Sequence, residues 1–374
     1  MKYYCYDQYK TLHIRGGLPG HVNISPCCAS VTEETPSSPF DFSTVRPLRN
    51  IRESSALGIP PSACSYCWNN EKTDGTSRRL HSNDFQNRMS NNSNSIFDTT
   101  IELKQLDITT QNICNLACIQ CGSGSSSTWA EQLGLPKVIS SYDDKIAVFK
   151  QIDHSKLVKL HFTGGEPLMT SEHQKILEIL ASENNLQKIN LSYNTNGTFF
   201  PDQDVIDLWH QTNKCNIAIS IDAIGPAAEF IRWPCIWSQV YNTIDKFVSL
   251  SKNSTKININ LVCCVSNYNI LELVDIKKLS DHFGIDIQLQ VNNMPCFYPE
   301  ILPRQLLDGA TDALLPYSMF DQLVQRITAP QSATVRRTQG SYLLRDAITY
   351  LDQLDAKRNT DWRTALKFGN FFPK

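Results

Sequence analysis

Cys114-Asn-Leu-Ala-Cys118-Ile-Gln-Cys121 is the stretch that decides how this chain folds and what chemistry it supports. It follows shortly after residues 101–108, an apolar run with the length of a buried strand. Ligand-binding loops of α/β folds lie beyond the carboxyl ends of strands, so we expect the three cysteines on such a loop. Three thiolates at this spacing can each hold one corner of a cubane iron-sulfur cluster, and they leave the fourth iron without a protein ligand. That iron is then open to a small molecule.

From residue 101 onward, short apolar runs alternate with longer amphipathic segments. This rhythm is typical of repeated βα units and a parallel sheet. The six expected strands are residues 101–108, 157–162, 188–193, 215–221, 256–263 and 285–291. The helices expected between them include residues 173–182, 205–211, 237–251 and 271–283. The sequence therefore predicts the α/β class, as a barrel or a doubly wound sheet.

The second expected strand ends in Leu160-His-Phe-Thr-Gly-Gly-Glu-Pro-Leu168. Gly164 and Gly165 let backbone carbonyls come close to a ligand, and Glu166 can accept a charge-assisted hydrogen bond from an ammonium group. Such a motif alone could be an ordinary turn. One βα unit after the cysteine loop, however, it is hard to ascribe to chance.

The cysteine spacing and the Gly-Gly-Glu-Pro turn together resemble the radical S-adenosylmethionine (SAM) superfamily, whose motif is CxxxCxΦC with a commonly apolar Φ. Gln120 stands at Φ and departs from that pattern. The resemblance implies a partial (β/α)6 radical SAM barrel, with a [4Fe-4S] cluster on Cys114, Cys118 and Cys121 and SAM at the open iron. Zinc is the alternative, but structural zinc usually takes four ligands, and no fourth Cys or His lies within ten residues.

Later strand ends supply further candidates by the same resemblance. Asn194-Thr-Asn-Gly197 and Ser220-Ile-Asp222 resemble polar strand tips of the family, and Arg232 resembles an arginine that faces the SAM carboxylate. Each short motif is equally compatible with a turn or a helix cap, and Arg232 could instead stack on Trp233. The expected SAM-binding residues are Gly164, Gly165, Glu166, Asn196, Ser220, Asp222 and Arg232.

The first 82 residues contain five cysteines, are rich in proline and show little periodicity, which is typical of a small unit that a metal holds together. Their pattern resembles the truncated SPASM domains called twitch domains, in a version that precedes the barrel. The resemblance implies a second, auxiliary [4Fe-4S] cluster after a strand hairpin (12–14 and 22–27), with Cys28 uninvolved. Its ligands would be Cys5, Cys27, Cys64 and Cys67. A structural zinc knuckle with four cysteines is the competing interpretation.

The remaining chain divides into a polar, Asn- and Ser-rich linker, the barrel and a helical end. The predicted units are residues 1–82, 83–100, 101–298 and 299–374, with an amphipathic helix at 341–358. The linker contains the sequon Asn91-Asn-Ser93, which has no role in a cytosolic protein. His13, His154, His161 and His210 are assigned to no site. Cys215, Cys263 and Cys264 read as small buried hydrophobes, whereas Cys235 and Cys296 lie near the expected barrel mouth and are candidate thiols.

Composition limits the classes of function. Of 374 residues, 35 are Lys or Arg and 37 are Asp or Glu, so a net charge of -2 disfavours nucleic-acid binding. There is neither an apolar stretch of about 20 residues nor a signal-like amino terminus, which predicts a cytoplasmic protein without membrane insertion. In such a protein the 13 cysteines are metal ligands or reactive thiols before they are disulfides.

By resemblance, the chain is expected to cleave SAM reductively to a 5′-deoxyadenosyl radical that abstracts a substrate hydrogen. The leading expected substrate is a ribosomally made peptide, modified by oxidation, crosslinking, epimerisation or excision. A small molecule such as an aminoglycoside precursor is the second candidate, and a non-catalytic iron-sulfur or zinc protein is the third. The expected partners are a flavodoxin- or ferredoxin-type electron donor and a separate peptide-recognition protein.

Overall fold

The computed structural model describes residues 2–73, 75–89, 98–137, 141–292, 294–330 and 339–372. Within them, nine strands form one sheet in the order β3-β2-β1-β4-β5-β6-β7-β8-β9. The strands are β1 (Thr11–Gly16), β2 (His21–Ser25), β3 (Glu33–Pro36), β4 (Gln105–Thr109), β5 (Lys159–Thr163), β6 (Asn190–Thr195), β7 (Lys214–Ser220), β8 (Ile257–Val265) and β9 (Asp286–Val291). All six barrel strands predicted from the sequence are present, and each runs parallel to its neighbours.

The helices before and within the barrel are α1 (Asp7–Lys10), α2 (Arg46–Ala56), α3 (Ser65–Thr73), α4 (Arg78–Met89), α5 (Ser127–Gln132), α6 (Tyr142–Lys150), α7 (Glu172–Ser182), α8 (Gln203–Gln211), α9 (Gly225–Ile231), α10 (Trp237–Lys252) and α11 (Leu273–Phe283). Those after it are α12 (Arg304–Leu314), α13 (Asp321–Thr328), α15 (Ser341–Arg358) and α16 (Trp362–Ala365). Short 3-10 turns are η1 (Ser62–Cys64), η2 (Pro167–Met169), η3 (Leu186–Lys188), η4 (Ile270–Glu272), η5 (Pro295–Phe297), η6 (Pro299–Ile301), η7 (Ser318–Phe320) and η9 (Lys367–Phe371).

The amino-terminal hairpin is part of the barrel sheet. β1 pairs antiparallel with β2, as predicted, and pairs parallel with β4 on its other edge. Leu12 and Ile14 of β1 are fully buried, as are Leu106 and Ile108 beside them on β4. Burial of these side chains on one face joins the hairpin to the barrel, so a single sheet carries both.

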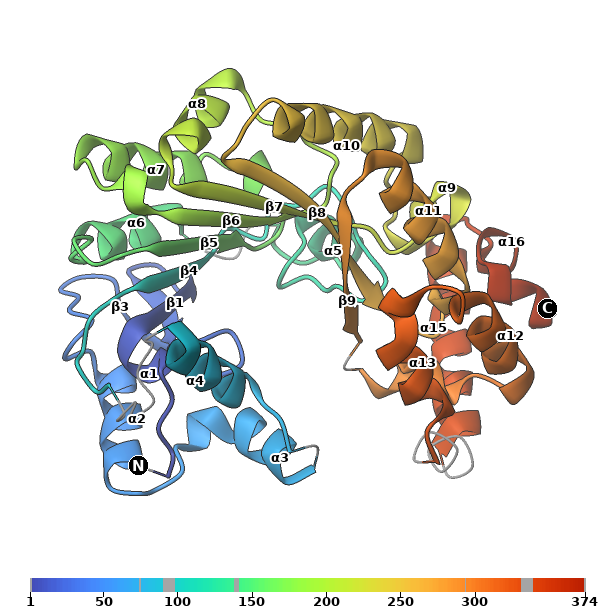
Figure 1. Cartoon of the computed structure of the whole chain (residues 1–374), viewed down its shortest axis with the longest axis horizontal. Coiled ribbons are helices and arrows are strands. Elements are labelled where there is room, and N and C mark those ends of the chain that lie inside the picture. The colour runs from blue at the N-terminus through green and yellow to red at the C-terminus, as the bar shows by residue number, and fades with distance from the viewer. Residues whose placement is uncertain are drawn as a thin grey trace.

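The two faces of the sheet differ in chemistry. Helices α6, α7, α8 and α10 cover the outer face, and the sheet arches over an open inner face between the amino- and carboxyl-terminal helices (Figure 1). Burial alternates along β5, β6, β7 and β8, with apolar side chains packed outward and polar ones inward. A parallel sheet covered on both faces would have near-continuous apolar strands, so this alternation marks an inner face that no helix layer among the described residues covers.

The carboxyl-terminal part is helical, as predicted, and α15 has the predicted bounds. After β9 the described residues contain no further strand. In the expected linker, residues 83–89 belong to α4, while residues 90–97, including the sequon, lie outside the described residues. The division into four units stays a prediction. No helix among the described residues has the length and apolar character to cross a membrane.

Candidate functional site

The cysteine loop follows β4 and is hydrogen-bonded to the end of α9 and to the segment after it. The backbone N–H of Ala117 donates to Trp233 O at 2.6 Å, and that of Ile119 donates to Ile231 O at 2.9 Å. Cys114 is buried and Cys118 and Cys121 are half-buried. Burial raises the pKa of all three thiols, that of Cys118 to about 12, although the nearby Arg232 guanidinium acts in the opposite direction on Cys118 and Cys121. A bound metal would be needed to keep these thiols deprotonated.

Glu166 joins the Gly-Gly-Glu-Pro turn to the tip of β6. Its carboxylate is fully buried and accepts hydrogen bonds from Leu168 N (3.1 Å), Thr195 Oγ1 (2.8 Å) and Asn196 N (2.6 Å). Burial raises the pKa of Glu166 to about 7, and the same hydrogen bonds oppose that rise. Three of the roughly four acceptor positions of the carboxylate are thus used by the protein, which leaves one for a ligand.

The two glycines before Glu166 allow the turn to press against the cysteine loop. Gly164 has a φ of 143°, and a Cβ there would collide with Thr110. A Cβ on Gly165 would collide with the backbone of Asn112 and Ile113. Their absent side chains therefore serve first to bring two loops together.

Asp222 is the centre of a buried hydrogen-bond network beside the loop. Its carboxylate accepts from Arg232 Nη1 (2.7 Å), Gln120 Nε2 (2.9 Å) and the backbone N–H of Cys264 (2.9 Å). Tyr268 Oη donates to Gln120 Oε1 at 2.7 Å. Gln120, the polar residue at a usually apolar position of the motif, therefore has partners for both ends of its amide.

Two buried guanidinium groups near the loop have nitrogen atoms without hydrogen-bond partners. These atoms are Arg232 Nε, and Nε and Nη1 of Arg358. Arg358 Nη2 donates to Ala117 O at 2.7 Å within the cysteine loop. A cubane with three thiolate ligands carries net negative charge, which buried cations offset. The residues around Cys114, Cys118 and Cys121 therefore fit such a cluster.

A second group of cysteines surrounds a small enclosed cavity in the amino-terminal part. Cys5, Cys27, Cys64 and Cys67 are all buried and all line it. Burial raises the pKa of Cys5 well above its ordinary value and that of Cys27 to about 12. The four cysteines named from the sequence thus lie together. Among the described residues, no three Cys, His, Asp or Glu side chains are arranged to hold a single metal ion.

Cys28 points elsewhere. It is exposed and lines a much larger cavity of about 860 Å³ under the inner face of the sheet. Arg78 Nη1 donates to Cys28 Sγ at 3.4 Å, and Arg78 is also ion-paired with Asp7 at 3.2 Å. Consecutive cysteines therefore face different cavities.

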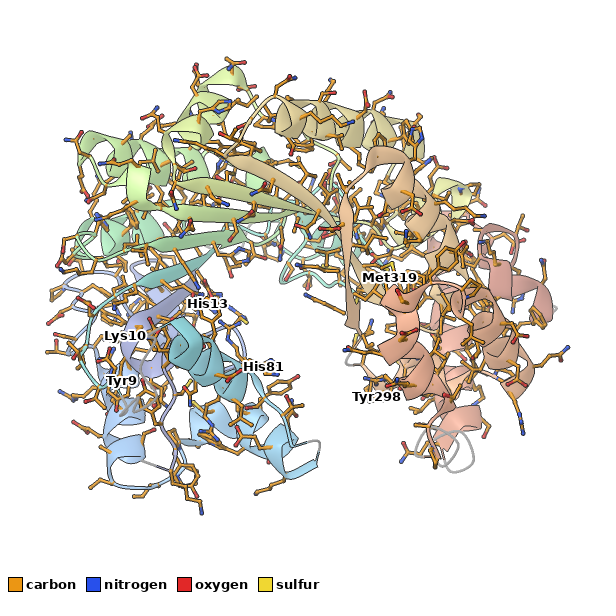
Figure 2. The ribbon with its side chains drawn as sticks, in the orientation of Figure 1. Tyr9, Lys10, His13, His81, Tyr298 and Met319 are labelled. Atoms are coloured by element: carbon orange, nitrogen blue, oxygen red, sulfur yellow. The ribbon has the colours of Figure 1, made fainter. Side chains whose placement is uncertain are left out.

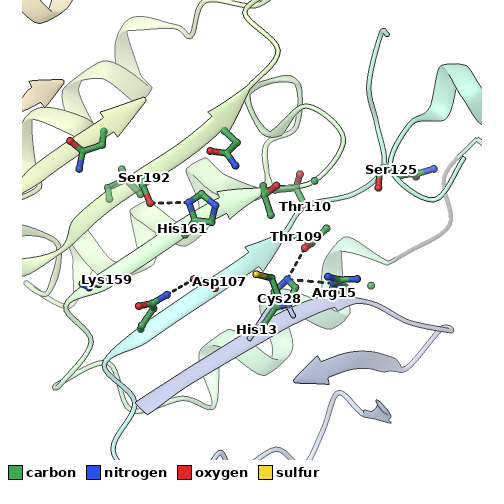
Figure 3. Close-up of a pocket in the computed structure, with 18 of the residues that line it drawn as sticks. His13, Arg15, Cys28, Asp107, Thr109, Thr110, Ser125, Lys159, His161 and Ser192 are labelled. Atoms are coloured by element: carbon green, nitrogen blue, oxygen red, sulfur yellow. Dashed lines mark hydrogen bonds between the residues drawn. The ribbon is translucent and has the colours of Figure 1, made fainter. Parts of the chain in front are cut away.

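The large cavity is lined by side chains from β1 and from β4 through β7 (Figure 3). His13 Nε2 is 2.9 Å from Thr109 Oγ1, and His161 Nδ1 is 2.8 Å from Ser192 Oγ. Burial lowers the pKa of both imidazoles, that of His13 to about 4, so both are neutral near pH 7. His13 lies on the inner side of the amino-terminal part, across the arch from Tyr298 and Met319 (Figure 2).

Residues 108–275 match the model of the Radical SAM superfamily. This part of the chain is a radical SAM domain. Among curated proteins, the chain is similar to molybdenum cofactor biosynthesis protein 1 of Dictyostelium discoideum, with 24% identity over 49% of this chain and 27% of that protein. It is also similar to GTP 3′,8-cyclases of Vibrio cholerae (24% identity, 45% of this chain, 48% of the other) and Aquifex aeolicus (22%, 50% and 55%). The match thus spans between about a quarter and about half of these relatives.

Two solved structures that match part of the chain are anSMEcpe with bound AdoMet and Streptococcus suis SuiB bound to the precursor peptide SuiA. The first has 18% identity and a TM-score of 0.42 over 59% of this chain and 62% of the other. The second has 12% identity and a TM-score of 0.39 over 84% and 70%.

The expected SAM-binding residues of the radical SAM domain lie at the strand tips around the cysteine loop. Several of them already contact other residues of the protein. Asn196 Nδ2 lies 3.6 Å from Cys114 Sγ, and Ser220 ends β7 half-buried. Arg232 pairs with Asp222 and does not stack on Trp233, whose ring faces the Arg358 guanidinium at 5.1 Å.

Sequence reasoning missed His13, His161 and Arg358. The two histidines were recognisable from their alternation with buried neighbours in Leu12-His-Ile14 and Leu160-His-Phe162, which places them on the inner face. Of the other residues set aside, His154 bonds Glu183 and Phe149 O away from the site, and Cys215 and Cys263 are fully buried. Cys235 is buried and donates to Ala228 O, and Cys296 is half-buried.

Proposed function

We propose that this chain is an enzyme that cleaves SAM on a [4Fe-4S] cluster held by Cys114, Cys118 and Cys121 and directs the resulting radical at a substrate in the large cavity. When bound by these cysteines, the cluster would supply the electron that splits the sulfonium of SAM. The observation that carries the proposal is that the large cavity adjoins the cysteine loop. Thr110, Asn112 and Gly164 line the cavity and belong to the two loops that hold the cysteines and Glu166. A radical formed at those loops would face the cavity directly.

The chain's own residues supply binding and orientation. Glu166 fixes the positions of two strand tips and has an acceptor position left for the SAM ammonium group. Arg232, held by Asp222, has a free Nε–H for the SAM carboxylate. Ser220 and Asn196 are the polar groups at neighbouring tips for the ribose. Glu166, Asn196 and Arg232 are already held by hydrogen bonds within the protein, so these side chains require little ordering when SAM binds.

We also propose that Cys5, Cys27, Cys64 and Cys67 hold an auxiliary [4Fe-4S] cluster. Four thiolates leave no open iron, so its role would be to take an electron from the substrate radical or to relay one. This favours a net oxidation or crosslink over a redox-neutral rearrangement. A flavodoxin- or ferredoxin-type protein would supply the electron for SAM cleavage.

For the substrate, a peptide and a small molecule remain the two candidates. The peptide follows from the resemblance to twitch and SPASM enzymes. The small molecule is favoured by the polar lining of the cavity and agrees with curated relatives whose name, GTP 3′,8-cyclase, specifies a nucleotide.

The test is anaerobic reconstitution with iron, sulfide, SAM and dithionite, followed by measurement of 5′-deoxyadenosine. The wild type should form it, and Cys118→Ala should not, because a cubane that loses one of three thiolates is under-ligated. Cys215→Ala is the matched control, since Cys215 is fully buried on β7 away from the loop. Near-normal product from Cys118→Ala would refute the assignment.

A further inference from the structure

The inner face of the sheet is polar from one edge of the cavity to the other. Residues opposite each other on adjacent strands form layers, because the strands are parallel and in register. One layer is His13, Asp107, His161, Ser192 and Asn216. The layer nearer the amino ends of the strands is Thr11, Gln105, Lys159, Asn190 and Lys214.

This lining is unusual for a barrel interior. Closed α/β barrels fill their interior with branched apolar side chains, and most ligand pockets are lined mainly by apolar groups. Here Leu191 is the one aliphatic residue among the described residues that line the cavity. A ligand that entered with a large apolar surface would leave amide and hydroxyl groups without partners, at a cost for each buried group. The lining therefore selects a ligand that forms many hydrogen bonds.

The charged groups of the cavity are unbalanced. Arg15, Arg78 and Lys159 face Asp107 as the one carboxylate among the lining residues that the structure describes. Arg78 is shared between Asp7 at 3.2 Å and Asp107 at 3.9 Å.

Arg15 and Lys159 are the cations that the protein leaves for a ligand. Among the described residues, no carboxylate lies within ion-pair distance of either one. Arg15 Nε is 3.5 Å from His13 Nε2, and Lys159 Nζ lies over the Phe85 ring at 4.4 Å. Arg15 is level with Thr109 near the cysteine loop, whereas Lys159 is level with Gln105, four residues or about 13 Å lower along the strands. Walls of low dielectric concentrate the field of such cations in a cavity.

We propose that the substrate is a small hydrophilic anion, which carries phosphate or carboxylate groups and is bound by the amide and hydroxyl groups of the inner face. This inference rests on the proposed function, because it concerns the substrate of the same site. Arg15 and Lys159 attract the negative charge, one by direct contact and the other through its field. A peptide side chain of apolar character does not fit this lining.

The test is calorimetry of the cluster-loaded, SAM-saturated protein under anaerobic conditions, with pyrophosphate and citrate as probes and glucose as a neutral control. Saturating SAM occupies the site of Arg232. We expect at least one anion to bind, more weakly as salt is raised, and glucose to bind less well. Binding of pyrophosphate alone indicates a phosphate group, and binding of citrate alone indicates carboxylates.

The variants are Arg15→Gln and Lys159→Gln. Binding should weaken about tenfold at the residue in direct contact, which corresponds to about 1.4 kcal/mol, and less at the other. Lys246→Gln is the matched control, because Lys246 also lies over a phenylalanine ring, that of Phe200 at 5.8 Å, but on α10 outside the cavity.

Failure of both anions to bind, or equal loss in Lys246→Gln and both cavity variants, would overturn the inference. Binding is measured without turnover. A protein that binds the anions but does not cleave SAM would refute the proposed function and leave the cavity assignment intact, so the two failures are distinguishable.

Discussion

Replacing Arg358 with Leu should destabilise the protein and loosen the cysteine loop. Arg358 is the last residue of α15, is 8% exposed, and donates from Nη2 to Ala117 O at 2.7 Å. Its guanidinium carbon lies 4.8 Å from the Trp129 ring centre and 5.1 Å from that of Trp233. Together with Tyr350, whose Oη donates to Ile119 O at 3.0 Å, Arg358 thus attaches α15 to the cysteine loop of the radical SAM domain.

The magnitude follows from these contacts. A hydrogen bond from a charged donor contributes about 1.5 to 3 kcal/mol, and a partly desolvated cation–π contact about 1 to 2 kcal/mol. Leucine would lose one such hydrogen bond and two such contacts. It would also remove the cost of burying Nε and Nη1 without partners, which offsets part of the loss. We therefore expect a net loss of about 2 to 4 kcal/mol in the free energy of unfolding.

Urea denaturation of the iron-free protein measures this loss without a contribution from bound clusters. Arg345→Leu is the matched control, because Arg345 is an exposed residue of the same helix with one cation–π contact, to Tyr342 at 5.3 Å. Reconstituted Arg358→Leu should also retain less iron on gel filtration. Equal denaturation midpoints for Arg358→Leu and Arg345→Leu would refute the reasoning.

Three further predictions follow from buried groups. Glu166→Gln should lower the free energy of unfolding by about 1 to 3 kcal/mol above pH 7. The reason is that the amide NH₂ group of Gln must face a backbone N–H donor, that of Leu168 or that of Asn196. Burial raises the pKa of Glu166 from 4.5 to about 7, so ionisation of this carboxyl group disfavours the folded state. Between pH 4.5 and 7 the free energy of unfolding of the wild type should therefore fall by about 3 kcal/mol relative to that of Glu166→Gln. Identical dependence of stability on pH in the two proteins would contradict this. In protein lacking the three loop cysteines, Cys28→Ala should keep about four irons per chain and Cys27→Ala should lose them, as iron and sulfide analysis would show; zinc in their place would contradict the cluster. Lys145→Met should cost about 3 to 5 kcal/mol in thermal or urea unfolding, because it strands the buried Glu172 carboxylate 2.8 Å from Lys145 Nζ, and an unchanged stability would mean that this pair is dispensable.

The elements of the fold were predictable because they depend on local patterns. The short apolar runs that form the strands and the helical stripe of α15 are properties of single segments, and the sequence predicts both sets of elements. The parallel pairing of β1 with β4 was not predictable. It joins segments about 90 residues apart, and what selects it is the fit of Leu12 and Ile14 to a buried face. No pattern within either strand specifies that partner.

The candidate site shows the same division. The loop motifs identify Cys114, Cys118, Cys121 and Glu166 because local spacing is what their proposed roles require. Arg358 reaches Ala117 from 241 residues away, and its contact depends on how α15 packs. The polar cavity is an intermediate case, because the alternation of polar and apolar residues along β5, β6 and β7 is a local pattern that indicates which side chains face inward. The inward orientation of His13 and His161 could have been predicted from the sequence, but only on the assumption that the inner face of the sheet lines a cavity and is not packed as a core.

The positions of Cys27 and Cys28 suggest what the pairing of the amino-terminal hairpin with the barrel sheet contributes to the proposed function. Cys27 lines the four-cysteine cavity and Cys28, the next residue, lines the large cavity proposed for the substrate, while Arg78 lines both. An auxiliary cluster can take an electron from a substrate radical only if it stays close to the substrate, and a module on a flexible tether would not keep that distance. The pairing of β1 with β4 would fix the distance between the two cavities. His13 of β1 lines the large cavity, and Ser25 of β2 donates to Cys27 O at 2.8 Å. Within the proposed function, the hairpin that leads into Cys27 would thus itself be a wall of the substrate site.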